Sequence, residues 1–259
     1  MNAVGKPDKI KRSVMYSSTD EGGLNMPNVQ HQEYALKIAW VKRLCSEEVP
    51  QSWQSLVKSQ LPNQWKVILD GNISEKDLKL ANLLPRNSFW QHVLLNWSRL
   101  THSEPKRKAD VLDQSLSYNS FIKLGNQVVF NKALHDANIR HIKDILNDEG
   151  QFMSYREFQQ KHGARINFVE YYGMVSAILK KWKGIISGTV NVDNGLEYTH
   201  GFKILPKLVE AEKTTKTIYK LFSSQFAQFP TPLMQNWGNE LGCEINKDII
   251  SSALRKINK

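Results

Sequence analysis

Apolar side chains recur at helical spacing along much of this chain, and the longest such run covers residues 167–182. Asn167 and Glu170 stand at the spacing of a helix N-cap and its third residue, where both side chains can accept free backbone N–H groups. The apolar residues in this run are Phe168, Tyr171, Tyr172, Val175, Ile178, Leu179 and Trp182. Because this period places apolar side chains on one side of a helix, we expect a long amphipathic helix here.

The same helical period recurs elsewhere in the chain. Shorter stripes cover residues 29–44, 51–61, 88–100 and 214–226. Ser74, Ser88 and Ser154 are capping-type starts, since a serine oxygen can accept the free N–H groups of a first helical turn. The sequence therefore predicts a mainly α fold, an irregular assembly of several helices without a large sheet.

One short hairpin is expected near residues 121–130. Two β-prone runs, 121–124 and 127–130, flank Gly125 and Asn126. Glycine and asparagine readily adopt the positive φ angles that a two-residue hairpin turn requires. The pair therefore predicts a tight turn between two antiparallel strands.

The segment 138–182 has the proportions of a helix-turn-helix unit. It consists of a stripe at 139–146 that Asn138 would cap, a short helix opened by Ser154, and the long helix at 167–182. The same pattern also describes a plain packing unit of three helices. Both interpretations stay open at this point.

Four basic residues of this segment are candidate phosphate contacts. They are Arg165 in the turn, and Lys180, Lys181 and Lys183 at the end of the long helix. The N-terminus of that helix would add free N–H groups near Arg165. In the alternative interpretation the lysines only complement the negative end of the helix dipole.

Residues 105–117 are the expected boundary between two lobes. They are polar, Pro105 breaks a helix, and acids adjacent to the basic run 106–108 cancel its local charge. A solvated linker fits this composition better than a nuclear-localisation signal. We therefore expect a basic arm with a helical lobe at 1–104, and a hairpin followed by a helical lobe at 118–259.

The net charge of +10 is spread along the chain, and the isoelectric point is near 9.5. Such a balance favours polyanions and suggests nucleic acid, although positive charge can also serve solubility alone. No apolar run approaches the length of a membrane span, and the first twenty residues lack a signal-peptide core. We expect an intracellular protein, nuclear or cytoplasmic, without a membrane partner.

Motifs of catalysis are missing from the sequence. It contains no P-loop, no dinucleotide-binding glycine motif, no His-Glu-x-x-His and no Asp-Asp pair. Cys45 and Cys243 stand far apart, and the seven histidines fall at no ligand spacing. We therefore expect no catalysis, no cofactor, no metal site and no small-molecule substrate.

Several short motifs follow one another along the chain. A basic stretch from residue 9 leads into Gly22-Gly23-Leu-x-x-Pro27 and then a predicted helix that bears Trp40. Further along are Tyr118-Asn-x-x-Ile122, Ser154-Tyr-Arg-Glu157, Lys216-Thr-Ile-Tyr219 and Pro230-Thr followed by Trp237. In this order the motifs resemble the region after the polymerase domain in non-LTR, LINE-type retrotransposon reverse transcriptases.

The resemblance implies that a complete protein would be an endonuclease and reverse transcriptase that nicks DNA and primes cDNA synthesis there. The polymerase and endonuclease motifs have no counterpart in this chain, and the family's terminal Cys/His-rich segment is missing too. For this chain the resemblance therefore implies a truncated, non-catalytic fragment that contacts template RNA or target DNA, mainly through the phosphate backbone.

The nucleic-acid contacts expected from this reading are a flexible N-terminal arm and the basic residues of 138–182. The arm contributes Lys9, Lys11 and Arg12. Two alternatives remain, a helical protein–protein interaction module and a non-functional retrotransposon remnant.

Overall fold

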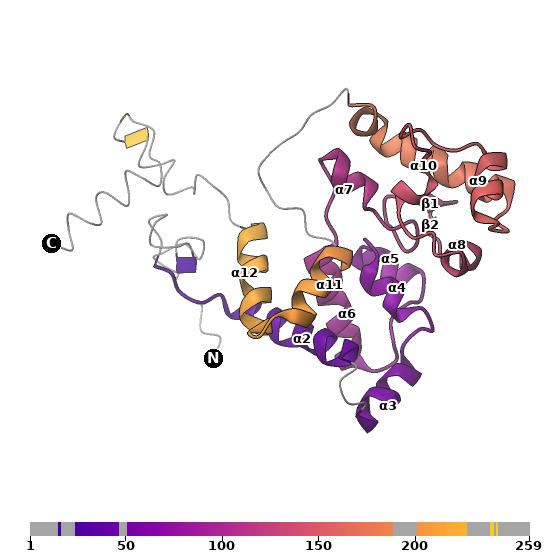
Figure 1. The fold of residues 1–259 in the computed structure, drawn as a ribbon. Helices are drawn as coiled ribbons and strands as arrows, with labels where there is room; N and C mark the ends of the chain where they lie inside the picture. Colours follow the sequence, from indigo (N-terminus) through magenta and orange to yellow (C-terminus); the bar gives the residue numbers. More distant parts are fainter. Residues whose placement is uncertain are drawn as a thin grey trace. The chain divides into compact units, whose positions relative to one another are not determined.

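The computed structural model describes residues 15–16, 24–46, 51–188, 201–226, 239–240 and 242 of the 259-residue chain. Within these residues it contains eleven α-helices, a 3₁₀ turn and one two-stranded antiparallel sheet (Figure 1). The prediction of a mainly α fold with one short hairpin is confirmed. The elements are α2 (Val29–Cys45), α3 (Ser52–Gln60), α4 (Trp65–Asp70), α5 (Glu75–Leu80), α6 (Ser88–Thr101), α7 (Lys108–Leu112), β1 (Lys123–Leu124), β2 (Gln127–Val128), α8 (Lys132–Asp136), η2 (Ile142–Ile145), α9 (Tyr155–His162), α10 (Phe168–Ile186), α11 (Gly201–Glu210) and α12 (Thr214–Phe226).

The chain forms two compact units, one of residues 1–36 and 215–259 and the other of residues 37–214. In the first unit the rings of His31 and Phe222 stack with centroids 5.8 Å apart. The hydroxyl of Tyr219 accepts the backbone N–H of Asn28 at 2.9 Å. These contacts join the beginning of α2 to α12.

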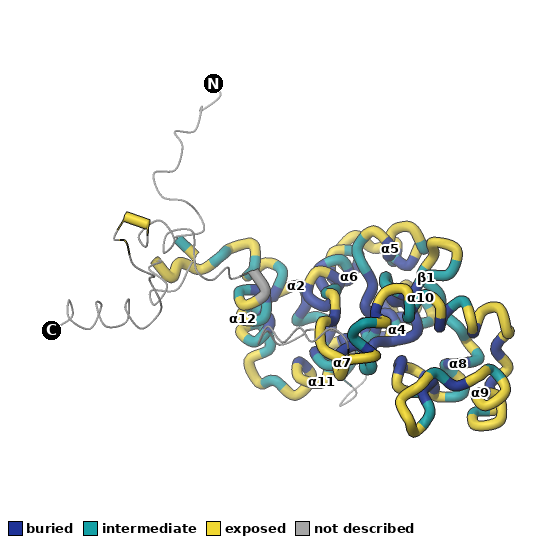
Figure 2. The backbone as a smooth tube through the Cα atoms, turned by 90° about the horizontal axis from the view of Figure 1, so that it is seen from above, coloured by how far each residue is buried: buried dark blue, intermediate teal, exposed yellow. Residues whose placement is uncertain are grey.

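The second unit contains two apolar cores. The larger one gathers buried side chains from α7, α8, η2, α9 and α10, with Ile142, Phe158, Tyr171 and Trp182 among its least exposed members. The smaller one centres on Ile68, Ile73 and Leu78, from α4, α5 and the segment between them. In Figure 2 the dark blue, buried stretches of α4 and α6 mark the interior of this unit.

The predicted hairpin is present. Lys123 pairs with Val128 and Leu124 with Gln127, so the turn consists of Gly125 and Asn126. These two residues have φ angles of 56° and 67°. Positive φ at both positions is the geometry of a type I′ turn, whose twist matches that of the flanking strands.

Capping signals located helix starts to within a residue. The side chain of Ser154 accepts the N–H of Glu157, whose carboxylate in turn accepts the N–H of Ser154 at 2.7 Å. Ser74 caps α5 as predicted. For α6 the cap is Asn87 rather than Ser88, because the Asn87 carbonyl oxygen accepts two N–H groups of the first turn.

The predicted helix at 139–146 is wrong. Its centre is the single 3₁₀ turn η2, and Asn138, the expected cap, has a φ of 59° and follows the end of α8. The isoleucines at 139, 142 and 145 are spaced by three residues, which matches the 3.0-residue period of a 3₁₀ helix. The helix-turn-helix proportions near 138–182 therefore reduce to two helices, α9 and α10, joined by residues 163–167.

Residues 105–117, predicted as a solvated linker between lobes, lie inside the second unit. They contain α7, in which Val111 is fully buried and the side chain of Asp110 is 1% exposed. Asp110 is buried because Arg107 and Lys203 of α11 contact its carboxylate at 2.6 and 3.0 Å. The basic run 106–108 is exposed, as its composition suggests, whereas the later part of the segment is buried and Asp110 is a paired charge rather than a solvated one.

Candidate nucleic-acid interface

Helix α10 carries most of the basic residues that the sequence singled out. It begins after Asn167, whose side chain accepts the N–H of Val169 at 2.9 Å, and it runs to Ile186. One side of the helix is buried in the larger core through Tyr171, Met174, Val175, Ile178, Trp182 and Ile186. The prediction of a long amphipathic helix is confirmed, and exposed residues line its opposite side.

The turn before α10 fixes the position of Arg165. Gly163 ends α9 in the left-handed conformation, with a φ of 61°. Ala164 and Ile166 are buried, whereas Arg165 between them is exposed. The two buried neighbours thus anchor the turn and direct the arginine to solvent.

Besides Phe168, Glu170 and Lys181, which are also exposed, α10 has one exposed face of Val169, Tyr172, Ser176 and Lys180. At 3.6 residues per turn these four positions lie within about 80° of one another. Lys183, one turn further on, is also exposed. Within the described residues neither lysine forms an ion pair, so both ammonium groups are available to an anion.

Two acidic residues lie near this face and accept hydrogen bonds from neutral groups, so they keep their charge. Glu170 lies about 100° around the helix from Val169 and accepts a hydrogen bond from the side chain of Asn131 at 3.0 Å. Glu157 accepts the N–H of Ser154 as part of the α9 cap. The four positions of the face itself contain no acid, and Glu170 is exposed beside it.

Lys181 differs from the other two lysines. It lies about 100° around the helix from Lys180. Its ammonium group pairs with Glu104 at 2.8 Å and lies 5.4 Å from the ring centre of Phe121. The sequence does not distinguish Lys181 from Lys180 and Lys183, but in the structure Lys181 contacts residues of its own unit.

Trp182 interrupts the regular geometry of α10. Its backbone angles, φ −127° and ψ 17°, are not helical, and the helix is kinked there. The indole is 1% exposed and, among the described residues, its N–H has no hydrogen-bond partner. The kink separates Lys183 from the regular part of the helix.

The candidate residues do not form one compact site. With a rise of 1.5 Å per residue, the first residue of α10 and Lys183 are about 22 Å apart, so Arg165 and the lysines lie at opposite ends of the helix. Together they mark the two ends of an exposed strip. The N-terminal arm residues Lys9, Lys11 and Arg12 lie outside the described residues.

The Tyr118-Asn-x-x-Ile122 motif has a structural explanation. Asn119 is fully buried, and its amide group donates to the backbone oxygen of Ser115 at 2.9 Å and to the side chain of Gln114 at 3.2 Å. Its carbonyl oxygen accepts the N–H of Phe121. A buried amide with all these partners holds the loop before the hairpin, and it offers no group to a ligand.

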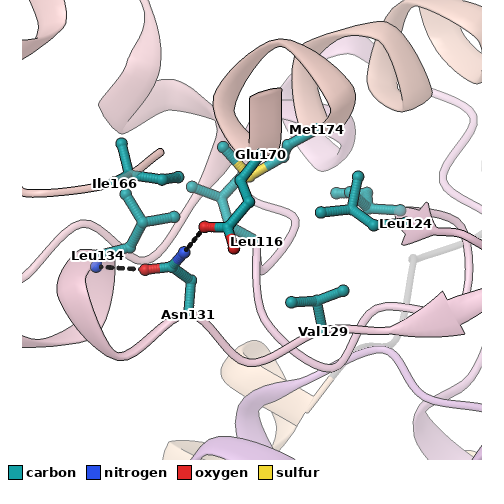
Figure 3. Close-up of a pocket in the computed structure, with 9 residues that line it drawn as sticks. Leu116, Leu124, Val129, Asn131, Leu134, Ile166, Glu170 and Met174 are labelled. Carbon is teal, nitrogen blue, oxygen red and sulfur yellow. Dashed lines mark hydrogen bonds between the residues drawn. The ribbon is translucent and has the colours of Figure 1, made fainter. Parts of the chain in front are cut away.

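A pocket beside α10 offers little to a phosphate. Figure 3 shows it between the helix, the hairpin and α8, with about 310 Å³ of space that includes solvent at its mouth. Most of its lining is aliphatic, and its polar residues, Asn131 and Glu170, bond to each other. The charge of Glu170 would repel an anion, so this pocket is not part of the candidate interface.

Sequence reasoning missed the exposed aromatic residues at the start of α10. Phe168 is 56% exposed and Tyr172 is 40% exposed, although both belong to the apolar stripe that predicted the helix. The adjacent pair Tyr171 and Tyr172 contained the signal, because neighbouring residues of a helix point about 100° apart and both cannot face one core. Tyr171 is buried and Tyr172 is not.

The residues with a described position contain no cluster of three or more His, Cys, Asp or Glu that could hold a metal ion. In that same part of the chain, no helix is long and apolar enough to cross a membrane. Comparison of the chain with protein-family models, with curated proteins and with solved structures finds no match.

Proposed function

We propose that this chain is a non-catalytic nucleic-acid-binding region of a LINE-type reverse transcriptase, corresponding to the part that follows the polymerase domain. The motif order from Gly22-Gly23 to Trp237 supports the family. RNA or DNA is the partner, held mainly by its phosphate backbone. Neither a cofactor nor a small-molecule substrate takes part.

The exposed face of α10 is the observation that carries the proposal. Arg165 stands at one end, and Lys180 and Lys183 at the other, with no acid on the face between them. A strip of this kind, about 22 Å long, can contact several phosphates of one strand. Such contacts release counterions and make binding strongly dependent on salt.

The test compares two variants of the full chain by fluorescence anisotropy with a labelled oligonucleotide over a range of salt concentrations. The triple variant Arg165→Ala, Lys180→Ala, Lys183→Ala removes the strip. Each lost phosphate contact removes roughly 0.7–0.9 from the slope of log affinity against log salt, so we expect a loss of about 2 to 3.

Lys181→Ala is the matched control. It removes one positive charge from the same helix, and its ammonium group is already paired with Glu104. We expect the salt slope of this variant to stay close to that of the wild type. A triple variant with intact helical circular dichroism and an unchanged slope would contradict the proposal, and the basic charge would then serve solubility or a protein contact.

The absence of catalysis is tested separately. We expect no metal-dependent nucleotide incorporation and no strand cleavage by the purified chain, because two-metal chemistry needs clustered carboxylates. Incorporation that disappears when one of the chain's own acids is replaced would contradict this part of the proposal.

A further inference from the structure

The beginning of α10 presents a cluster of exposed apolar side chains, here called the aromatic end. It consists of Phe168, Val169 and Tyr172, which are 56%, 72% and 40% exposed. Tyr155 of α9, which is half-buried, lies next to them. Exposed apolar side chains gathered in one place mark a surface that another molecule covers.

The rings of the aromatic end are held in fixed positions. Phe168 and Tyr172 have ring centroids 4.7 Å apart, and Tyr155 meets Phe168 edge-on at 5.4 Å. The hydroxyl of Tyr155 donates to the backbone oxygen of Ile166 at 2.8 Å, while the Tyr172 hydroxyl accepts the N–H of Tyr155 at 3.4 Å. Rings ordered before binding lose little conformational entropy when a ligand stacks on them.

The charged residues near the aromatic end indicate which class of molecule binds there. Arg165 precedes it, and the same face of α10 continues through Ser176 to Lys180, while the exposed Glu170 lies about 100° around the helix from Val169. Single-stranded nucleic acid is bound by this combination, in which cations follow the backbone and aromatic rings stack on unpaired bases. Bases in a duplex are already stacked on each other and cannot reach such rings.

We propose that Phe168 and Tyr172 stack on unpaired bases, so that α10 binds single-stranded nucleic acid in preference to a duplex. Lys180 and Lys183 hold phosphates of the same strand. This inference rests on the proposed function and adds a substrate class to it, a single strand or the unpaired end of a duplex.

The experiment uses the full chain with two labelled probes, a single-stranded oligothymidylate and a hairpin duplex that carries the same number of phosphates. The variant Phe168→Leu, Tyr172→Leu keeps apolar side chains but removes both rings. Stacking on an aromatic ring strengthens binding by roughly tenfold per base. We expect the double variant to bind the single strand roughly tenfold to a hundredfold more weakly, with an unchanged salt slope and unchanged duplex binding.

Two further variants separate stacking from general apolar contact. Val169→Ser removes the most exposed side chain of the aromatic end without removing a ring, and we expect it to bind both probes like the wild type. Tyr172→Trp keeps an aromatic ring at its position, and we expect the binding of the single strand to be retained.

The outcomes distinguish this inference from the proposed function. If the wild type binds both probes with equal affinity and the double variant keeps both affinities, the stacking proposal is overturned. The proposed phosphate contacts of Arg165, Lys180 and Lys183 would still stand. If the wild type binds neither probe, both proposals fail. If the double variant instead abolishes self-association and leaves binding of the single strand intact, the aromatic end is a protein contact and the inference is overturned.

Discussion

Gly201 lies at the point where the beginning of α11 touches α4. A Cβ atom placed on Gly201 would be 1.8 Å from the backbone oxygen of Leu69, so any side chain there forces the two helices apart. We expect Gly201→Ala to lower the free energy of unfolding by about 1–3 kcal/mol, the usual range for overpacking. Urea unfolding followed by circular dichroism measures the change.

Gly173 provides the control for this prediction. A Cβ atom there would meet only the Cδ2 atom of Leu124, at 2.9 Å, and Leu124 borders the pocket of Figure 3 and has room to move. Alanine is favoured over glycine inside a helix by about 1 kcal/mol, which offsets the crowding. We expect Gly173→Ala to change the free energy of unfolding by less than about 1 kcal/mol. An equal loss in both variants would argue against the helix contact as the cause.

At the same scale, single charges were only partly predictable. Arg165 and Lys180 are exposed, as expected for charged residues outside the apolar stripe of α10. The pairing of Lys181 with Glu104 depends on how two distant segments meet, and no local pattern encodes that contact. The same is true of Asp110. Its polar neighbours in the sequence suggest a solvated position, but Asp110 is buried and paired with the distant Lys203.

Among the elements, those defined by local signals were predicted best. The Gly125-Asn126 turn, the caps at Ser154 and Asn167, and the long stripe of α10 each depend on neighbours within a few residues. Helix α11 was missed, because Pro206 lies inside it and a proline usually ends a helix. That helix depends on packing against α4 rather than on its own propensity.

The kink at Trp182 divides α10 into a long regular part and a short final turn. Few backbone hydrogen bonds hold the piece after the kink, so it can open independently of the longer part. We expect backbone amides at 183–186 to exchange hydrogen for deuterium faster than those at 174–181, and mass spectrometry of the full chain measures the difference.

The opposite exchange pattern would contradict this prediction. Uniform protection across the whole of α10 would mean that the final turn opens only when the helix does. In that case Lys183 is held as rigidly as Lys180, and both lysines belong to one rigid helix when nucleic acid binds.

Across the second unit, buried and half-buried carboxylates link stability to pH. Burial alone would raise the pKa of Asp110, but hydrogen bonds from Arg107 and Lys203 outweigh it and lower that pKa. In Asp144 burial is likewise outweighed by hydrogen bonds from the His141 side chain and from the N–H groups of His141 and Arg140, and the pKa falls to about 2. The pKa values of Asp77 and Asp113 are lowered by their lysine partners in spite of burial.

A lowered pKa in the folded state means that the unfolded chain binds protons first as the pH falls. The contribution of these carboxylates is therefore complete above about pH 5, and it is lost as pH drops below 4 toward about 2. We expect the urea midpoint to be nearly constant from pH 7 to 5 and to fall steeply between pH 4 and 2.

Asp144→Asn should flatten the acid part of this profile. Asp136→Asn is the surface control, because its carboxylate pairs with Lys132 where both side chains are largely exposed. Exposed pairs contribute little to stability, so we expect that variant to keep the wild-type profile. A profile that is flat for the wild type would mean that these carboxylates do not couple folding to protons.

The contact between Lys203 and Asp110 also determines when the second unit can be completed during synthesis. Lys203 follows Asp110 by 93 residues. Ribosomes add roughly 5–20 residues per second, so Asp110 leaves the ribosome about 5–20 seconds before its partner. Throughout that interval Arg107, three residues away, can neutralise the carboxylate that α11 later seals into the interior.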